Sequence, residues 1–188
     1  MSVVAIPEVK STTSTWNIDP AHSTAQFKVK HMMISNVKGE FTSLKGALEL
    51  NEQNLEHSRV QAEIDAASIS TREPQRDAHL KSADFFDVEK FPTLLFRSTK
   101  VSRKSGDELA VSGELTIHGV TRPVTFTVEG PSEAATDPWG NKRIGLSGTT
   151  KINRKDFGLT WNTALETGGI LVGDEVSITL DVQFVKTN

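Results

Sequence analysis

Apolar and polar residues alternate with a period of two in short runs along most of this chain. The clearest run contains Val176, Ile178, Leu180, Val182 and Phe184, with a polar residue between each pair. Side chains of a β-strand point alternately to its two faces, so such a run predicts a strand with one buried face and one solvent-facing face. Comparable runs predict strands over residues 25–30, 41–50, 59–65, 93–101, 109–117, 124–129, 144–152 and 176–185.

A set of about eight such strands favours an all-β fold closed into an antiparallel barrel, because closure buries one face and removes the exposed sheet edges. The interior of an eight-stranded barrel is either filled by side chains or wide enough for one slender ligand. Gly46, Gly113 and Gly148 fall within the predicted strands, and their missing side chains favour a cavity. The alternative is a close-packed barrel in which a large neighbour fills each gap.

The segment between residues 68 and 92 loses the alternation and predicts a helical insertion around residues 74–87. Pro74 suits the first turn of a helix, where its missing N–H has no partner to lose. We expect a short helix from Pro74 and a second turn around residues 83–87. Asn36, His118-Gly119 and Gly168-Gly169 are predicted turns.

Length and composition indicate one globular domain. The chain has 188 residues, a formal net charge of −3 and no cysteine. The absence of a basic excess argues against nucleic-acid binding, and the absence of cysteine excludes disulfides and thiol chemistry. No stretch approaches the roughly 20 apolar residues of a membrane-spanning helix, so we expect no integral membrane segment.

The first fifteen residues form a separate region in this interpretation. Only Val3 to Ile6 are apolar before Pro7, and a Ser/Thr-rich run follows. This pattern lacks the features of a secretory signal. We expect residues 1–15 to be a flexible tail, residues 16–188 to form the barrel domain, and the protein to be cytoplasmic, or periplasmic if the chain is a processed form.

The predicted helix carries the first group of polar candidates. Arg76, His79 and Leu80 share one helix face at spacings of three and four residues. In a functional interpretation, Arg76 and His79 donate hydrogen bonds to an anionic or carbonyl head group at the barrel mouth. In a structural interpretation, Asp77 pairs locally and His79 anchors the helix to the barrel.

Arg154 and the histidines are the other candidates. Arg154 lies two residues from Asp156, which allows either an ion pair or an Arg154 side chain that neutralises a ligand phosphate. His22, His31, His79 and His118 show no compact metal-ligand spacing, so we expect no metal site. No Gly-x-Ser-x-Gly elbow is present, and we expect no catalytic residue.

Several motifs, in order along nearly the whole chain, resemble the YceI-like family. They are Trp16 to Ser23, Phe27 to His31, Gly39 to Phe41, Ser70-Thr71, Arg76 to Leu80, Asp84 to Asp87, Phe91-Pro92, Gly113 to Thr121 and Asn153 to Gly158. The resemblance implies a lipocalin-like extended antiparallel barrel that binds a polyisoprenoid chain, such as a polyprenyl phosphate or a quinone tail, in an apolar lumen. It also implies a homodimer and no catalysis.

The expected function is therefore non-enzymatic carriage or sequestration of a long-chain isoprenoid lipid, with no other cofactor. The expected lumen residues are Phe27, Val29, Ile64, Phe96, Phe126, Leu146 and Ile178, and the expected head-group residues are His22, Arg76, His79 and Arg154. One alternative is an enzyme that acts on a lipid head group through His79, Asp77 and His22. Another is a filled barrel that serves as a stress-response or interaction module.

Overall fold

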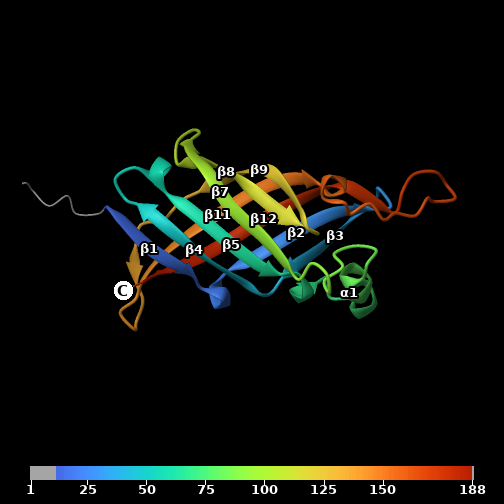
Figure 1. Cartoon of the computed structure of the whole chain (residues 1–188), viewed down its shortest axis with the longest axis horizontal. Coiled ribbons are helices and arrows are strands. Elements are labelled where there is room, and N and C mark those ends of the chain that lie inside the picture. Colours follow the sequence, from blue (N-terminus) through green and yellow to red (C-terminus); the bar gives the residue numbers. More distant parts are fainter. Residues whose placement is uncertain (1–11, 188) are drawn as a thin grey trace, which may run out of the picture.

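The structure, a computed structural model, describes residues 12–187 and contains twelve β-strands and one α-helix (Figure 1). The helix is α1 (Pro74–Lys81). The strands are β1 (Thr13–Ile18), β2 (Thr24–His31), β3 (Ser35–Phe41), β4 (Leu44–Asn51), β5 (Arg59–Asp65), β6 (Ile69–Ser70), β7 (Thr93–Arg103), β8 (Glu108–Ile117), β9 (Val120–Glu129), β10 (Ala135–Thr136), β11 (Lys142–Asn153) and β12 (Val172–Lys186).

Eight of these strands close into an antiparallel barrel, as the alternation predicts. The ring runs β11-β9-β8-β7-β5-β4-β1-β12 and returns to β11. The closing pair is long, because β11 and β12 stay in register from Arg143 opposite Val185 to Asn153 opposite Glu175. The apolar positions of each run therefore face one shared interior.

Two neighbouring strands of the barrel wall are interrupted. Both β1 and β2 pair with β12, along successive stretches, and a short 3₁₀ helix at Pro20–His22 separates them. The strand next to them in the wall is also interrupted, between β3 and β4. At this break, the backbone N–H groups of Thr42 and Ser43 bond to Ser68. The prediction of one strand over 41–50 is wrong for this reason.

The predicted turn at Asn36 is also wrong, because Asn36 lies in β3 opposite Lys30 of β2. The chain instead reverses at residues 32–34. The sequence carries a sign of the break between β3 and β4: inward positions are odd-numbered from Ala25 to Phe41 and even-numbered from Leu44 to Leu50.

The tail prediction needs a correction at its boundary. Residues 13–15 belong to β1, where Thr13 pairs with Asn51 and Thr15 with Glu49 of β4. Residues 1–11 of the predicted tail lie outside the described residues. The barrel domain therefore begins a few residues earlier than the sequence motifs suggested.

The helical insertion is confirmed. The side chain of Glu73 accepts hydrogen bonds from the backbone N–H groups of Gln75 and Arg76, which caps the start of α1. Hydrogen-bonded turns follow over residues 83–90, and Leu80 and Phe86 pack on the barrel core. The insertion thus covers one end of the barrel (Figure 1). Within residues 12–187, no helix has the length and apolar character needed to span a bilayer.

Candidate functional site: an apolar lumen

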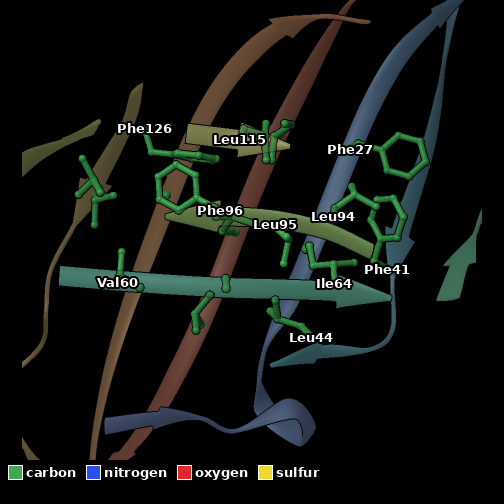
Figure 2. Close-up of a pocket in the computed structure, with 18 of the residues that line it drawn as sticks. Phe27, Phe41, Leu44, Val60, Ile64, Leu94, Leu95, Phe96, Leu115 and Phe126 are labelled. Carbon is green, nitrogen blue, oxygen red and sulfur yellow. The ribbon is translucent and has the colours of Figure 1, made fainter. Parts of the chain in front are cut away.

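The barrel encloses a cavity of about 260 Å³ whose wall is almost entirely apolar. Side chains from β2, β4, β5, β7, β8, β9, β11 and β12 contribute to it (Figure 2). The polar residues in its lining are Gln26, Ser58, Arg59 and Arg154. Such a cavity offers a ligand dispersion contacts and removal of apolar surface from water, with few hydrogen bonds.

All seven apolar residues predicted for the lumen line this cavity. They are Phe27, Val29, Ile64, Phe96, Phe126, Leu146 and Ile178. Most of them are only half-buried although they point into the barrel, whereas the surrounding cluster residues are fully buried. Their exposed surface faces open space in the lumen, which is the part of the wall that a ligand would contact.

Three clusters of buried side chains surround the lumen, and all members of one of them, Val101, Leu109, Val111, Phe126 and Val128, line it; the other two extend beyond the lining. Of these two, the first contains Trp16, Leu48 and Phe184, and the second contains Phe41 and Phe157. The cavity reaches both, since Leu48 and Phe184 line it on one side and Phe41 and Leu159 on the other. Residues of all three packed regions therefore bound the open space.

Aromatic side chains narrow the lumen at two places. The Phe96 and Phe126 rings meet edge to face with centroids 5.2 Å apart. Nearer α1, the Phe41 ring contacts Phe27 and Phe86, each with a centroid separation of 5.8 Å. Figure 2 shows Phe27 and Phe41 at one side of the view and Phe96 with Phe126 at the other. Phe41 and Phe86 were not predicted to line the lumen, although the change in alternation at Phe41 marks it as inward.

The glycines give the cavity less room than the sequence suggested. A Cβ atom on Gly113 would lie 2.3 Å from the Arg97 carbonyl oxygen and 2.7 Å from the Phe96 ring. A Cβ atom on Gly46 would lie 2.3 Å from the Gln61 carbonyl oxygen. The prediction of open space at these two glycines is wrong, because neighbouring groups fill it. Gly148 lines the cavity, and a Cβ atom there would make only ordinary contacts of 3.5 Å or more.

Arg154 is a structural clamp in this fold. Its side chain is 4% exposed, and it donates to the carbonyl oxygens of Gly173, Leu159, Trp161 and Val172 at 2.6–3.3 Å. Burial lowers the pKa of the guanidinium, and the charge of Asp174 opposes that shift.

The ionic partner of Arg154 differs from the expected one. Its guanidinium lies 3.7 Å from Asp174, and Asp156 is not its partner. The predicted phosphate-neutralising role is not supported by this geometry, since carbonyls take four of the five N–H donors and Asp174 faces the guanidinium.

The polar residues of α1 also serve the docking of the helix. Arg76 Nε donates to Thr71 Oγ1 at 2.8 Å, and an Asp77 carboxylate oxygen accepts from the same Thr71 hydroxyl at 2.5 Å. His79 Nε2 pairs with Asp84 at 2.8 Å, and its ring lies edge-on to Trp161 with centroids 4.7 Å apart. Neither Arg76 nor His79 lines the cavity, which agrees with the structural interpretation of these residues, and their contact with a head group at the barrel mouth stays a prediction.

His22 lies in a different ionic cluster. It pairs with Asp19 at 2.8 Å, and Arg143 joins Asp19 at 2.5 Å and Asp137 at 2.7 Å. Hydrogen bonds from Arg143 are the largest cause that holds the pKa of the Asp19 and Asp137 carboxyls at about 2. At Asp19, the hydrogen bond with His22 is the second cause. The His22 side chain is 61% exposed and does not line the apolar lumen, so its predicted contact with a head group stays a prediction.

The expected head-group residues therefore do not converge. His22 belongs to the Arg143 cluster, and His79 pairs with Asp84. Arg154 donates hydrogen bonds to backbone carbonyl oxygens of the 158–173 segment. In the part of the chain that the structure describes, no three His, Asp or Glu side chains are arranged to hold a metal ion. What the fold brings together is the apolar lining.

Comparison with known proteins identifies the same domain by sequence. The family model described as "YceI-like domain" matches residues 16–184. A UPF0312 protein of Vibrio parahaemolyticus is 40% identical over 137 residues, which cover 73% of this chain and 72% of the relative.

Solved structures share the barrel. Burkholderia cenocepacia BcnA superposes with a TM-score of 0.75 at 23% identity, covering 88% of this chain and 98% of BcnA. A polyisoprenoid binding domain from Saccharophagus degradans, implicated in plant cell wall breakdown, superposes with a TM-score of 0.65 at 14% identity, covering 92% and 98% of the two chains. At these identities the similarity establishes the fold.

Proposed function

Because this chain belongs to the YceI-like family, we propose that it binds a long-chain isoprenoid lipid in the barrel lumen without chemically changing it. The ligand class is a polyprenyl phosphate or an isoprenoid quinone, and the role is carriage or sequestration. A structural neighbour described as a polyisoprenoid binding domain supports this ligand class. The observation that carries the proposal is the apolar lining of a cavity that follows the barrel.

An apolar lumen suits a long hydrocarbon better than a small polar substrate. Each Å² of apolar surface that leaves water contributes about 25 cal/mol, before the cost of ordering the chain. A hydrocarbon chain that enters the lumen exchanges water for Phe, Leu, Val and Ile side chains along its length. Selectivity then follows from lumen width at the Phe96–Phe126 and Phe27–Phe41 contacts.

The polar residues give no specific support to the alternative of a head-group enzyme. General acid–base catalysis requires groups within hydrogen-bond reach of one reacting atom. His22 and His79 have separate carboxylate partners, Asp19 and Asp84, and neither lines the cavity. Binding alone is therefore the function that the arrangement favours.

Lipid extraction from freshly purified protein tests the proposal. The protein is isolated without detergent, extracted with organic solvent, and the extract is identified by mass spectrometry. The expected result is an isoprenoid lipid in a stoichiometric amount, because a buried apolar ligand is retained through purification. An extract that contains no lipid above the level of a control protein, together with no uptake of added polyprenyl phosphate or quinone, would overturn the proposal.

A further inference from the structure

The turn between β2 and β3 carries most of the exposed large apolar residues among residues 12–187. Met32, Met33 and Ile34 form the turn, with exposed fractions of 39%, 58% and 79%. They are three of the four large apolar residues that are exposed among residues 12–187. We call these three residues the apolar tip. Figure 1 shows this turn at the end of the molecule that carries α1 and the 158–171 segment.

The backbone of the apolar tip is conformationally costly for the residues it contains. Met32 and Met33 have φ angles of 52° and 61°, and the Ile34 N–H donates to the His31 carbonyl oxygen at 3.1 Å. A hairpin turn with positive φ at both central residues favours Asn-Gly, because other side chains crowd the backbone there. Two methionines occupy positions where folding alone favours other residues.

A basic surface adjoins the apolar tip. Lys28 and Lys30 of β2 and Lys38 of β3 are exposed, and Lys28 lies directly opposite Lys38. Like charges at directly opposed positions destabilise a strand pair. Among the described residues, none of these three lysines has a carboxylate within 4.0 Å, a feature that they share with Lys81, Lys100, Lys104 and Lys142. This basic surface occurs in a chain whose net charge is −3.

We propose that the apolar tip and the three lysines dock the protein on an anionic lipid bilayer. The tip supplies apolar side chains that enter the interfacial region, and the lysines meet anionic head groups within a Debye length of the surface. Methionine side chains are flexible and adapt to such a surface. A tip of three residues is small beside the area that a stable protein interface buries, which favours a bilayer over a second copy of the chain.

The apolar tip lies close to the lumen, so docking would bring one end of the lumen to the bilayer. The strands that carry the tip also carry Phe27 and Val29, which line the cavity. The Met32 N–H donates to the Leu171 carbonyl oxygen at 2.8 Å, which ties the turn to the segment clamped by Arg154. Docking would therefore place this end of the barrel next to the bilayer that holds an apolar ligand. This consequence rests on the proposed lipid-binding function, whereas docking itself does not.

Vesicle co-sedimentation tests the docking directly. Vesicles of phosphatidylcholine with phosphatidylglycerol are compared with vesicles of phosphatidylcholine alone, at low and high salt. We expect wild-type protein to bind the anionic vesicles and to release them at high salt. The Lys28→Gln/Lys30→Gln/Lys38→Gln variant should bind them about tenfold or more weakly.

The decisive variant replaces the strained methionines by the residues that the turn favours. Met32→Asn/Met33→Gly should melt at the wild-type temperature or higher, because Asn-Gly suits positive φ at both positions. It should nevertheless lose vesicle binding by about tenfold or more. A purely structural role of the apolar tip predicts a lower melting temperature and unchanged vesicle binding for this variant. Trp139→Ser is the matched control, since Trp139 is 81% exposed and lies in a different loop, and it should bind like the wild type.

Two outcomes would overturn the inference. In one, Met32→Asn/Met33→Gly binds anionic vesicles as tightly as the wild type. In the other, wild-type protein does not bind the vesicles, and sedimentation shows a dimer that the same variant abolishes. The apolar tip would then contact a second copy of the chain. Lipid extracted from the lumen is measured in parallel, and its presence in the variant separates a failure of docking from a failure of the proposed ligand.

Discussion

The Phe96 ring fills the space that a side chain at Gly113 would need. Phe96 lies on β7, and a Cβ atom on Gly113 of the neighbouring strand β8 would approach its ring within 2.7 Å. On the far side, Phe96 meets Phe126 of β9 edge to face. The glycine therefore leaves room for the Phe96 ring, which lines the lumen beside Phe126.

Gly113→Ala should destabilise the barrel, and Gly148→Ala should not. The added methyl group at Gly113 meets the Arg97 carbonyl oxygen and the Phe96 ring, so we expect a loss of about 1–3 kcal/mol in the free energy of unfolding. At Gly148 the methyl group makes ordinary contacts, and lower entropy of the unfolded chain should give a change between zero and about 1 kcal/mol of stabilisation. Urea denaturation of the two variants provides the comparison. Equal stabilities would contradict the close contact at Gly113.

The alternation predicted most of the barrel because inward positions follow one simple rule within each unbroken strand. Six of the seven proposed lumen residues follow from this rule, and Phe96 is the exception. The rule carries no information about what fills the space beside a glycine, which depends on the neighbouring strand. Gly46 and Gly113 were misinterpreted for that reason.

The polar residues were harder to predict, because their partners are distant in sequence or are backbone groups. Arg143 and Asp19 are 124 residues apart, and no spacing pattern links them. Arg154 bonds to carbonyl oxygens, which every residue possesses, so its sequence context could not distinguish a clamp from a phosphate ligand.

Arg154→Ala should weaken the fold around the 158–173 segment. The substitution leaves buried carbonyl oxygens without donors, so we expect a loss of about 3 kcal/mol in the free energy of unfolding. Lys155→Ala is the matched control, because Lys155 is partly exposed and contributes one surface ion pair with Asp174, worth under about 1 kcal/mol. Urea denaturation gives both values, and hydrogen exchange should show faster exchange over residues 158–173 only in Arg154→Ala. A loss no larger than that of Lys155→Ala would show that Arg154 is free to contact a ligand.

The Arg143 cluster should stabilise the protein at neutral pH and lose that effect in acid. The pKa values of Asp19 and Asp137 fall from 3.8 to about 2 in the folded state. A carboxyl whose pKa is lowered by folding stabilises the fold above its unfolded pKa, and that contribution disappears as the pH falls toward the folded pKa. The melting temperature of Arg143→Ala should therefore lie below that of the wild type at pH 7, and the difference should shrink between about pH 4 and pH 2. Thermal melts followed by circular dichroism measure this difference, and a constant gap across that range would contradict it.

Charge at one inward position should abolish lipid binding, whereas the same charge one residue later should not. Phe126 faces the lumen, and Thr127 faces outward, where its hydroxyl accepts from Lys104 Nζ at 3.1 Å. Phe126→Asp places a carboxylate in apolar surroundings, which costs several kcal/mol unless it is neutralised. Thr127→Asp and Arg76→Ala should leave the amount of extracted lipid unchanged. Circular dichroism must show native strand content before the variants are compared.

Native mass spectrometry of delipidated protein titrated with a polyprenyl phosphate tests the central claim most directly. The Ile178→Trp variant fills open lumen space without introducing a charge, because Ile178 is half-buried and lines the cavity. We predict a one-to-one complex for the wild type and for Thr127→Asp, and at least about tenfold weaker binding for Ile178→Trp. Equal binding by wild-type protein and a folded Ile178→Trp variant would contradict the account, because the lipid would then lie outside the lumen.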